Sequence, residues 1–198
     1  MDDRRISFDP FSPKEIAEKV ETVGVAKAHM PTLQTLMLGA VAGGFIGLGA
    51  LYYTLVVSDA QLSFGVARVL GGVVFSLGLI LVVVAGAELF TGNNLLVCLA
   101  VWLALAGRSV TDKVLAIVFP ISAFVAAGFE HSVANMYFIP LGIFLAGDAG
   151  PAAGVNLATV NWHGFMNNLI PVTLGNIVGG SVLVALVYYI IYRPKPAD

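Results

Sequence analysis

The sequence predicts an all-α membrane protein, a helical bundle shortened to about four crossings, two of which are broken. The first observation is composition: 58% of the 198 residues are hydrophobic, 11% are charged, and the mean hydropathy is +0.90. A soluble domain carries about a quarter charged residues, and a disordered chain has few apolar ones. The other two observations are long tracts with few or no charges, and polar clusters that interrupt two of these tracts.

Residues 1–31 are predicted to form a cytoplasmic segment with an amphipathic helix over residues 11–24, and no cleavable signal peptide is expected. Ser12 and Glu15 match a capping box with proline at the first helical position, and Gly24 supplies a stop. Three apolar residues share one helical face: Ile16, Val20 and Val23. The sequence leaves two roles open for this helix, which either gates a pathway or only anchors the chain.

The first and last crossings of the predicted transmembrane domain, residues 32–192, are straightforward. Residues 32–57 carry no charged side chain and are long enough for one crossing, which takes about 20 residues. The last crossing is predicted over residues 165–192, which are also free of charge. Residues 193–198 are then a cytoplasmic tail.

Two tracts between these crossings have awkward lengths. Residues 69–107 contain one formal charge, Glu88, and residues 114–147 contain only Glu130 and His131 as ionisable side chains. Each tract is long for one unbroken crossing and short for two crossings with a loop. A polar cluster lies in the middle of each tract. The alternatives are therefore a crossing that is broken midway and a tight helical hairpin.

The positions of lysine and arginine decide between these topologies, because basic residues accumulate on the cytoplasmic side. If each awkward tract crosses once, nine of the ten basic residues lie in the cytoplasm with both termini, and Arg68 is the exception. If the first tract were a hairpin, Arg108, Lys113, Arg193 and Lys195 would lie outside. Four crossings, two of them broken, is the better topology.

The two breaks share features that favour a transport site. Backbone groups left unpaired at membrane depth are tolerated only where they are buried in protein or line a wet cavity. Residues 85–88 and 127–130 both have the pattern Ala-Gly-x-Glu, and the predicted topology enters them from opposite sides. Interrupted crossings in oppositely oriented halves are typical of transport sites.

His131 is the candidate functional side chain, because it is the only histidine well inside an apolar crossing. An ionisable residue in the membrane is a functional candidate by default. The alternative is a histidine that only hydrogen-bonds to backbone. Half-helices that begin after Asn94 and after His131 would direct positive dipole ends toward the membrane centre. This arrangement suits a small anion or its conjugate acid.

Other residues near the breaks receive structural expectations. Two carboxylates in the pathway would repel an anion, so Glu88 and Glu130 are expected to pair with backbone donors or to lie near an interface. Aromatic residues near span ends, Tyr53 and Trp102 among them, are expected in interfacial belts. Apolar residues beside the breaks either pack or form constrictions that hold back hydrated ions: Phe75, Leu79, Leu89, Phe90 and Phe124.

Three segments resemble motifs of the formate/nitrite transporter family, in its formate-channel branch: VVAGAELFTG at 83–92, GFEHSVANM at 128–136 and NLIPVTLGNIVGG at 168–180. The resemblance implies an aquaporin-like bundle that passes formate or a similar small monovalent anion. It implies a homopentamer with a pore in each protomer, in the inner (plasma) membrane. No enzymatic activity, cofactor or metal is expected, and the net charge of −2 gives no footprint for nucleic acid.

The resemblance also assigns residues. The family's pore threonine falls on Thr91, its central histidine on His131 and its final-helix asparagine on Asn176. Its apolar constrictions fall on the residues beside the breaks: Phe75, Leu79, Phe90 and Phe124, with Leu89 adjoining them.

The chain departs from the family in length, because members have six spans and this chain is short by about two. Residues 94–100 match the fourth span, yet they directly follow the loop that breaks the second. The end of the second span, the third and the start of the fourth are therefore missing, which leaves one hybrid crossing. The family's pore lysine has no counterpart, because no lysine lies between residues 28 and 112.

Three alternatives to a formate channel follow. The substrate could be nitrite or hydrosulfide, or the shortened chain could be a non-conducting membrane subunit. An intramembrane hydrolase using Ser132 beside His131 is disfavoured, because sequence neighbours seldom face one another on a helix.

Overall fold

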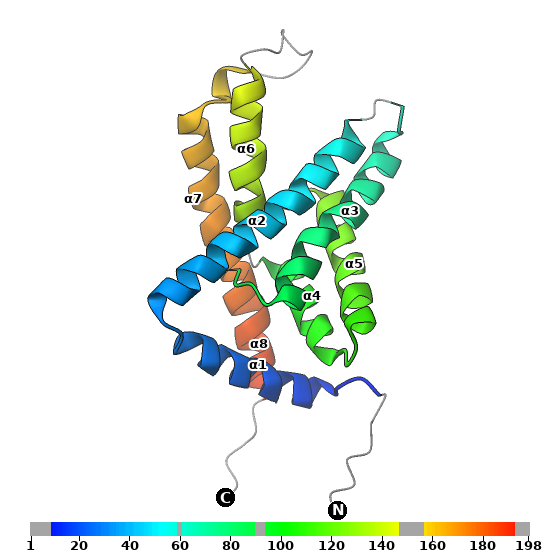
Figure 1. The fold of residues 1–198 in the computed structure, drawn as a ribbon, viewed down its shortest axis with the longest axis vertical. Helices are drawn as coiled ribbons and strands as arrows, with labels where there is room; N and C mark the ends of the chain where they lie inside the picture. The colour runs from blue at the N-terminus through cyan, green and yellow to red at the C-terminus, as the bar shows by residue number, and fades with distance from the viewer. Residues whose placement is uncertain (1–8, 59–60, 90–93, 147–156, 193–198) are drawn as a thin grey trace, which may run out of the picture.

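The computed structural model describes residues 9–58, 61–89, 94–146 and 157–192. Every regular element within these ranges is helical, which confirms the predicted all-α class (Figure 1). The elements in chain order are α1 (Pro13–Ala28), α2 (Thr32–Val57), α3 (Phe64–Ala85), α4 (Leu95–Ala106), α5 (Val110–Ala127), α6 (Ser132–Ala146), the 3-10 turn η1 (Leu157–Thr159), α7 (Trp162–Val178), the π-helical η2 (Gly179–Leu186) and α8 (Val187–Tyr192).

Four helical stretches are long and apolar enough to cross a bilayer: α2, α3, α5 and the stretch Trp162–Tyr192. In Figure 1, α2 leads away from α1, α3 returns to the middle of the molecule, and α4 continues toward the α1 end. Helix α5 then rises, α6 continues to the opposite end, and α7 to α8 come back. Two crossings therefore consist of two helices each, as the charge distribution predicts, and the shorter partners are α4 and α6.

Both breaks begin with the same helix ending. Gly86 ends α3 with φ of 79°, and Gly128 ends α5 with φ of 75°. After each glycine, the next N–H donates to the carbonyl five residues earlier, at 3.0 Å to Val82 and 3.2 Å to Phe124. This is the Schellman arrangement, in which a left-handed residue, usually glycine, stops a helix. The repeated Ala-Gly-x-Glu pattern therefore encodes two equivalent helix stops.

Both breaks also end in the same way, with a side chain that caps the next helix. The Oδ1 atom of Asn94 accepts the N–H of Val97 at 3.0 Å at the start of α4. The Nδ1 atom of His131 accepts the N–H of Ala134 at 3.1 Å at the start of α6. The expected half-helices after Asn94 and His131 are thus present, and each has one N-terminal donor paired locally.

Close approach of three helices forms the core beside the breaks. Helix α3 packs between α2 and α5. A Cβ atom on Gly49 of α2 would lie 2.7 Å from the carbonyl oxygen of Phe75 in α3, and one on Gly72 of α3 would lie 2.7 Å from that of Ser122 in α5. Glycine at these two positions lets the backbones meet, which is how helices pack tightly in lipid.

Helix α1 lies across the end of the bundle, next to α4 and α8 (Figure 1). Its predicted capping box is present, because the N–H of Ser12 donates to Glu15 Oε2 at 2.8 Å and the Glu15 N–H donates to Ser12 Oγ. The helix continues past Gly24 to Ala28, since one glycine inside a helix costs only about 1 kcal/mol. Burial, with Lys113 and Arg108 nearby, lowers the pKa of Lys19.

The two glycine stops offer a matched test of this geometry. The Gly86→Ala and Gly128→Ala substitutions should each lower the free energy of unfolding by about 1–2 kcal/mol, because a residue with an L side chain disfavours positive φ. At Gly128 the new methyl group would also lie 2.5 Å from Nη2 of Arg68, whereas nothing lies within 4 Å at Gly86. Displacing Arg68 from the Ala126 carbonyl should therefore add about 0.5–1.5 kcal/mol to the loss of stability of Gly128→Ala. Thermal unfolding in detergent measures both losses, and equal losses would contradict the predicted order.

Candidate functional site

The structure buries His131 where the second break meets α6, with 2% of its surface exposed. Its ring lies beside a cavity of about 260 Å³, which is called the His131 cavity below. Helices α2, α3, α5 and α6 all contribute to the walls. The walls include aromatic and charged side chains from these helices and from the second break: Tyr53, Arg68, Phe75, Phe124, Glu130 and Phe138.

The hydrogen bond at Nδ1 sets the chemistry of the His131 ring. A nitrogen that accepts an N–H, as Nδ1 does from Ala134, carries no proton, so the neutral ring carries its proton on Nε2. The ring also meets Phe124 edge to face, with centroids 5.9 Å apart. His131 therefore caps α6 with one nitrogen and keeps the other as a hydrogen-bond donor.

Asn176 fixes the backbone on both sides of His131. Its Oδ1 atom accepts the N–H of Ser132 at 3.0 Å, and its Nδ2 atom donates to the carbonyl of Glu130 at 3.1 Å. The Asn176 side chain is itself buried, with 5% exposed. The resemblance placed Asn176 in the pore, and the structure brings it to the residues that flank His131.

The carbonyl of Glu130 joins the two breaks. In addition to Asn176, the Nδ2 atom of Asn94 donates to this oxygen, at 3.3 Å. One carbonyl with two lone pairs thereby receives one donor from the first break and one from the last crossing. The start of α4, the start of α6 and the C-terminal turn of α7 are held together at this atom.

The two break carboxylates have side-chain partners and not the backbone donors that were one of the two expectations; the other, a place near an interface, stays a prediction. Glu88 forms an ion pair with Lys27 of α1, with an N–O distance of 2.8 Å and side-chain exposures of 17% and 47%. Glu130 accepts a hydrogen bond from Nδ2 of Asn135, which also donates to Oδ1 of Asn168 at 2.7 Å. Glu88 thus links the first break to α1, and Glu130 belongs to a polar chain that reaches α7.

The predicted constriction residues are only partly gathered at the cavity. Phe75 and Phe124 are buried and line the His131 cavity. Leu79 is buried in the adjoining core, and Leu89 packs against that core. Phe90 and Thr91 lie outside the described residues.

Two cavity residues were not assigned to the site from sequence. Tyr53 and Phe138 meet edge to face at 5.5 Å, and each ring also approaches Phe75, at 6.4 and 6.5 Å. Tyr53 was expected in an interfacial belt and lies in the cavity wall instead. Tyr53 lies at helical spacing from the buried residues Ala42, Ile46 and Ala50, and this spacing indicates that its side chain faces the core.

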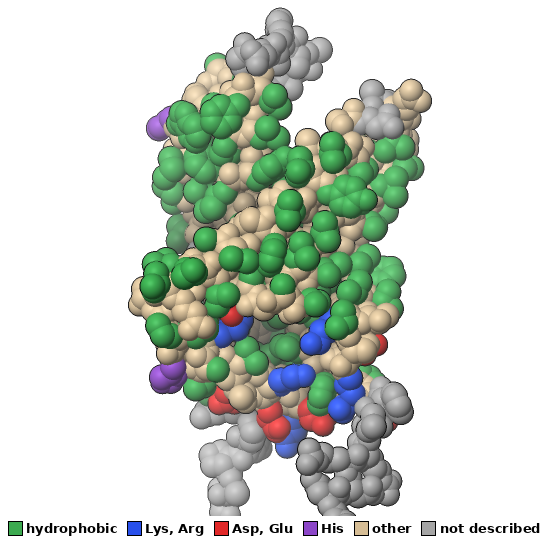
Figure 2. Space-filling view, viewed as in Figure 1, with side chains coloured by type: hydrophobic (Ala, Val, Ile, Leu, Met, Phe, Trp, Pro, Cys, Tyr) green, Lys and Arg blue, Asp and Glu red, His purple; other side chains and the backbone are tan. Residues whose placement is uncertain are grey.

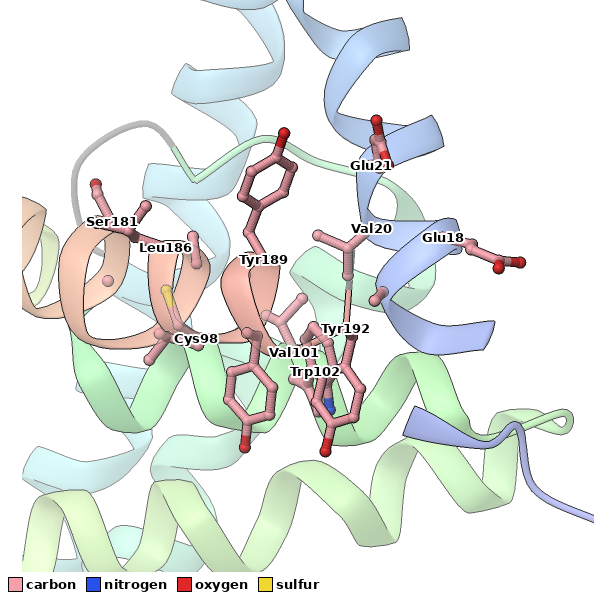
Figure 3. Close-up of a pocket in the computed structure, with 15 residues that line it drawn as sticks. Glu18, Val20, Glu21, Cys98, Val101, Trp102, Ser181, Leu186, Tyr189 and Tyr192 are labelled. Atoms are coloured by element: carbon pink, nitrogen blue, oxygen red, sulfur yellow. The ribbon is translucent and has the colours of Figure 1, made fainter. Parts of the chain in front are cut away.

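A larger cavity, with a volume of about 510 Å³, lies at the α1 end of the molecule between α1, α4 and the last crossing (Figure 3). Trp102, also expected in a belt, is buried here and stacks on Tyr188 at 4.2 Å. Val20 points into this cavity and Glu18 points away from it. Among the residues that the structure describes, no His, Cys, Asp and Glu side chains gather in a group that could hold a metal ion.

Comparison with known proteins gives a consistent family. The sequence model of the family described as "Formate/nitrite transporter" matches residues 14–97 and 94–190. The formate channel FocA of Escherichia coli (strain K12) is 34% identical over 272 aligned positions, which cover 93% of this chain and 95% of the relative. A probable formate transporter of Methanothermobacter thermautotrophicus is 32% identical, covering 91% and 97%.

Two solved structures have a similar fold. One is described as a pentameric formate channel with formate bound; its TM-score is 0.72 at 31% identity, with 82% of this chain and 98% of that chain covered. The other, described as an FNT family ion channel, has a TM-score of 0.68 at 25% identity, with 90% and 98% covered.

The alignments also confirm that this chain is internally short. They extend over 272 positions, although the chain has only 198 residues. The two stretches that match the family meet over residues 94–97, where α4 begins. The relatives therefore carry an internal segment that has no counterpart here, at the join that the sequence predicted.

The shared Glu130 carbonyl predicts coupling between the two asparagines. The Asn176→Ala substitution should lower the free energy of unfolding by about 1–3 kcal/mol, because it removes the Asn176 Oδ1 atom that accepts the Ser132 N–H. Asn94→Ala loses a helix cap and a donor to the same oxygen, at a cost of about 1–2 kcal/mol. Thermal unfolding of the single and double variants should show a non-additive loss, as residues in one network do. Simple additivity would contradict the shared carbonyl.

Proposed function

The chain belongs to the formate/nitrite transporter family, and from this premise we propose that it is a passive channel for formate or a similar small monovalent anion. The observation that carries the proposal is the meeting of two helix N-termini with a buried histidine. Helices α4 and α6 begin directly after Asn94 and His131, and the Asn94 side chain contacts the break at Glu130. The similarity to a formate channel with formate bound supports formate as the permeant.

The helix ends and His131 act on the permeant together. The N-termini of α4 and α6 carry partial positive charge, which favours an anion at the breaks. Phe75 and Phe124 form apolar walls that a hydrated ion crosses poorly. A bare anion between such walls is expensive, so His131 offsets the cost by donating a hydrogen bond from Nε2 of its neutral ring. Donating a proton instead would require the ring to be protonated first at Nδ1, which would break its bond to the Ala134 N–H.

Asn176 and Thr91 complete the proposed pathway. Asn176 positions His131 through the backbone of Glu130 and Ser132. Thr91, in the first break, supplies a hydroxyl to the permeant, a role that rests on the family resemblance. Leu79 and Leu89 support the constriction from the core.

We extend the proposal to topology and assembly. Residues 32–192 form the channel domain in the inner membrane, and residues 1–31 and 193–198 lie in the cytoplasm, because this orientation places nine of ten basic residues inside. The similarity to a pentameric channel supports a homopentamer. The protein is proposed to transport its substrate without transforming it.

A second candidate function has one observation in its favour. Phe129 has 60% of its surface exposed in the second break, and Glu130 beside it is exposed as well. Backbone breaks at membrane depth are tolerated only where protein or a wet cavity covers them. The shortened chain could therefore be a non-conducting subunit that full-length relatives cover.

Formate flux into proteoliposomes separates the two candidates. Liposomes containing the protein should take up formate well above protein-free liposomes, because the breaks and His131 are retained. Uptake at the protein-free rate would contradict the channel and favour the non-conducting subunit. Nitrite or hydrosulfide added in competition should reduce formate uptake in proportion to its own permeation, which identifies the preferred anion.

Two substitutions at His131 separate capping from permeation. His131→Phe removes both the α6 cap and the donor, and should lower formate flux about 10- to 100-fold and alter its pH dependence, since a hydrogen bond to a charged group contributes about 1.5–3 kcal/mol. His131→Asn keeps a cap and a donor but cannot titrate, so it should retain more flux with a flatter profile. Identical wild-type and His131→Phe flux from pH 5 to 8 would remove His131 from the mechanism.

A further inference from the structure

Arg68 is an exception to the charge distribution of this chain. It is the only basic residue between residues 28 and 107, and the proposed topology places it on the outer side, opposite the other nine. Loops on the outer side contain few lysine and arginine residues, because these residues accumulate in cytoplasmic loops and so set the orientation of a membrane protein. A lone outer arginine therefore calls for a reason other than topology.

The structure places Arg68 at the wall of the His131 cavity. It lies near the start of α3, and the same cavity is lined by His131 and by the proposed constriction residues Phe75 and Phe124. The Nε atom of Arg68 donates to the carbonyl of Ala126 at 3.3 Å, which ties the side chain to the end of α5.

Gly128 leaves room for the guanidinium group. A Cβ atom on Gly128 would lie 2.5 Å from Nη2 of Arg68, so only glycine leaves this position open. The Phe64 ring lies on another side, 5.6 Å from Cζ of Arg68. Within the described ranges of the chain, the Nη groups donate to no protein acceptor, whereas Nε is paired. Arg68 thus presents unpaired N–H donors beside the cavity.

Glu130 is the acidic group in the same cavity wall. Its carboxylate accepts a hydrogen bond from Nδ2 of Asn135 on α6. No ion pair joins it to Arg68 in the part of the chain that the structure describes. The guanidinium charge is therefore not neutralised by a direct partner there.

We propose that Arg68 is the anion-collecting and selectivity residue of the outer mouth, where its Nη groups bind the two carboxylate oxygens of formate before the anion passes Phe75 and Phe124 to reach His131. The inference rests on the proposed channel function and adds a binding step on the outer side. The planar fork of a guanidinium matches a carboxylate in bidentate fashion, and an ammonium does not. Arg68 therefore favours a carboxylate over an anion with a single charged atom.

Two consequences distinguish this role from a cap on α5. A charge at a cavity mouth raises the local concentration of the permeant by about tenfold or more, so it changes the concentration at which flux saturates. Salt screens such a charge, since the Debye length falls from about 10 Å at 0.1 M to about 3 Å at 1 M. A residue that only caps α5 would instead change the amount of folded protein and the maximal flux, without dependence on salt.

The test measures influx of labelled formate into right-side-out membrane vesicles against external formate concentration. Wild type is compared with Arg68→Gln, with Arg68→Lys, and with Lys14→Gln as a matched loss of charge on the proposed cytoplasmic side, where Lys14 is exposed. At low ionic strength, Arg68→Gln should raise the half-saturating formate concentration about tenfold. The difference should shrink in 1 M of an impermeant sulfonate salt, and Lys14→Gln should behave as wild type.

Arg68→Lys keeps the positive charge but loses the planar guanidinium group that can bind both oxygens of a carboxylate. It should recover the salt-dependent part of the effect, and its preference for formate over hydrosulfide should fall. Wild-type saturation in both Arg68 variants, with conducting wild-type protein, would overturn this inference and leave the channel function intact. A fall in thermal stability and maximal flux alone would assign Arg68 to capping α5 and would also overturn it. No formate influx in the wild type would overturn the channel function and this inference with it.

Discussion

The structure depends on how the backbone at Glu130 is paired. Two crossings stop and restart halfway, and each stop exposes carbonyl and N–H groups where lipid can satisfy none of them. The Glu130 carbonyl receives amide donors from Asn94 and Asn176, and the Ser132 N–H is accepted by Asn176. These hydrogen bonds pair the backbone on both sides of His131. The histidine is therefore fixed in place by the paired backbone of Glu130 and Ser132, and by the bond that its Nδ1 atom accepts from Ala134.

The equivalence of the two breaks explains how a small set of residues builds the site. Gly86 and Gly128 stop α3 and α5 at nearly the same φ, and Asn94 and His131 restart the chain as caps of α4 and α6. A cap must present an acceptor to the new helix. At the second break the acceptor is an imidazole, so the residue that caps α6 also retains a hydrogen-bond donor at Nε2. Structure and proposed chemistry therefore use different nitrogens of the same ring.

The breaks could be predicted from sequence because they depend on local rules. The Ala-Gly-x-Glu pattern specifies a helix stop through glycine, whereas the direction in which each crossing runs stays a prediction from the basic residues. The partners could not be predicted, since Asn94 and Asn176 lie 36 and 46 residues from Glu130 and their choice depends on packing. The Lys27–Glu88 pair is equally non-local. The helix stop predicted at Gly24 was wrong, because the weak helix-breaking preference of one glycine is outweighed by the rest of α1, which continues to Ala28.

The internal shortening is compatible with an intact site for a topological reason. The segment missing relative to the relatives meets this chain at residues 94–97, so α4 follows directly on the first break. Asn94, Glu130, His131 and Asn176 all lie in this chain, and the hydrogen bonds of Asn94 and Asn176 to the second break close across the join. Phe129, in the same break, has 60% of its surface exposed, and a break at membrane depth needs cover by protein or by a wet cavity. Protein or water must therefore lie against this flank if the break sits within the membrane, whereas the hydrogen bonds around His131 close within the chain.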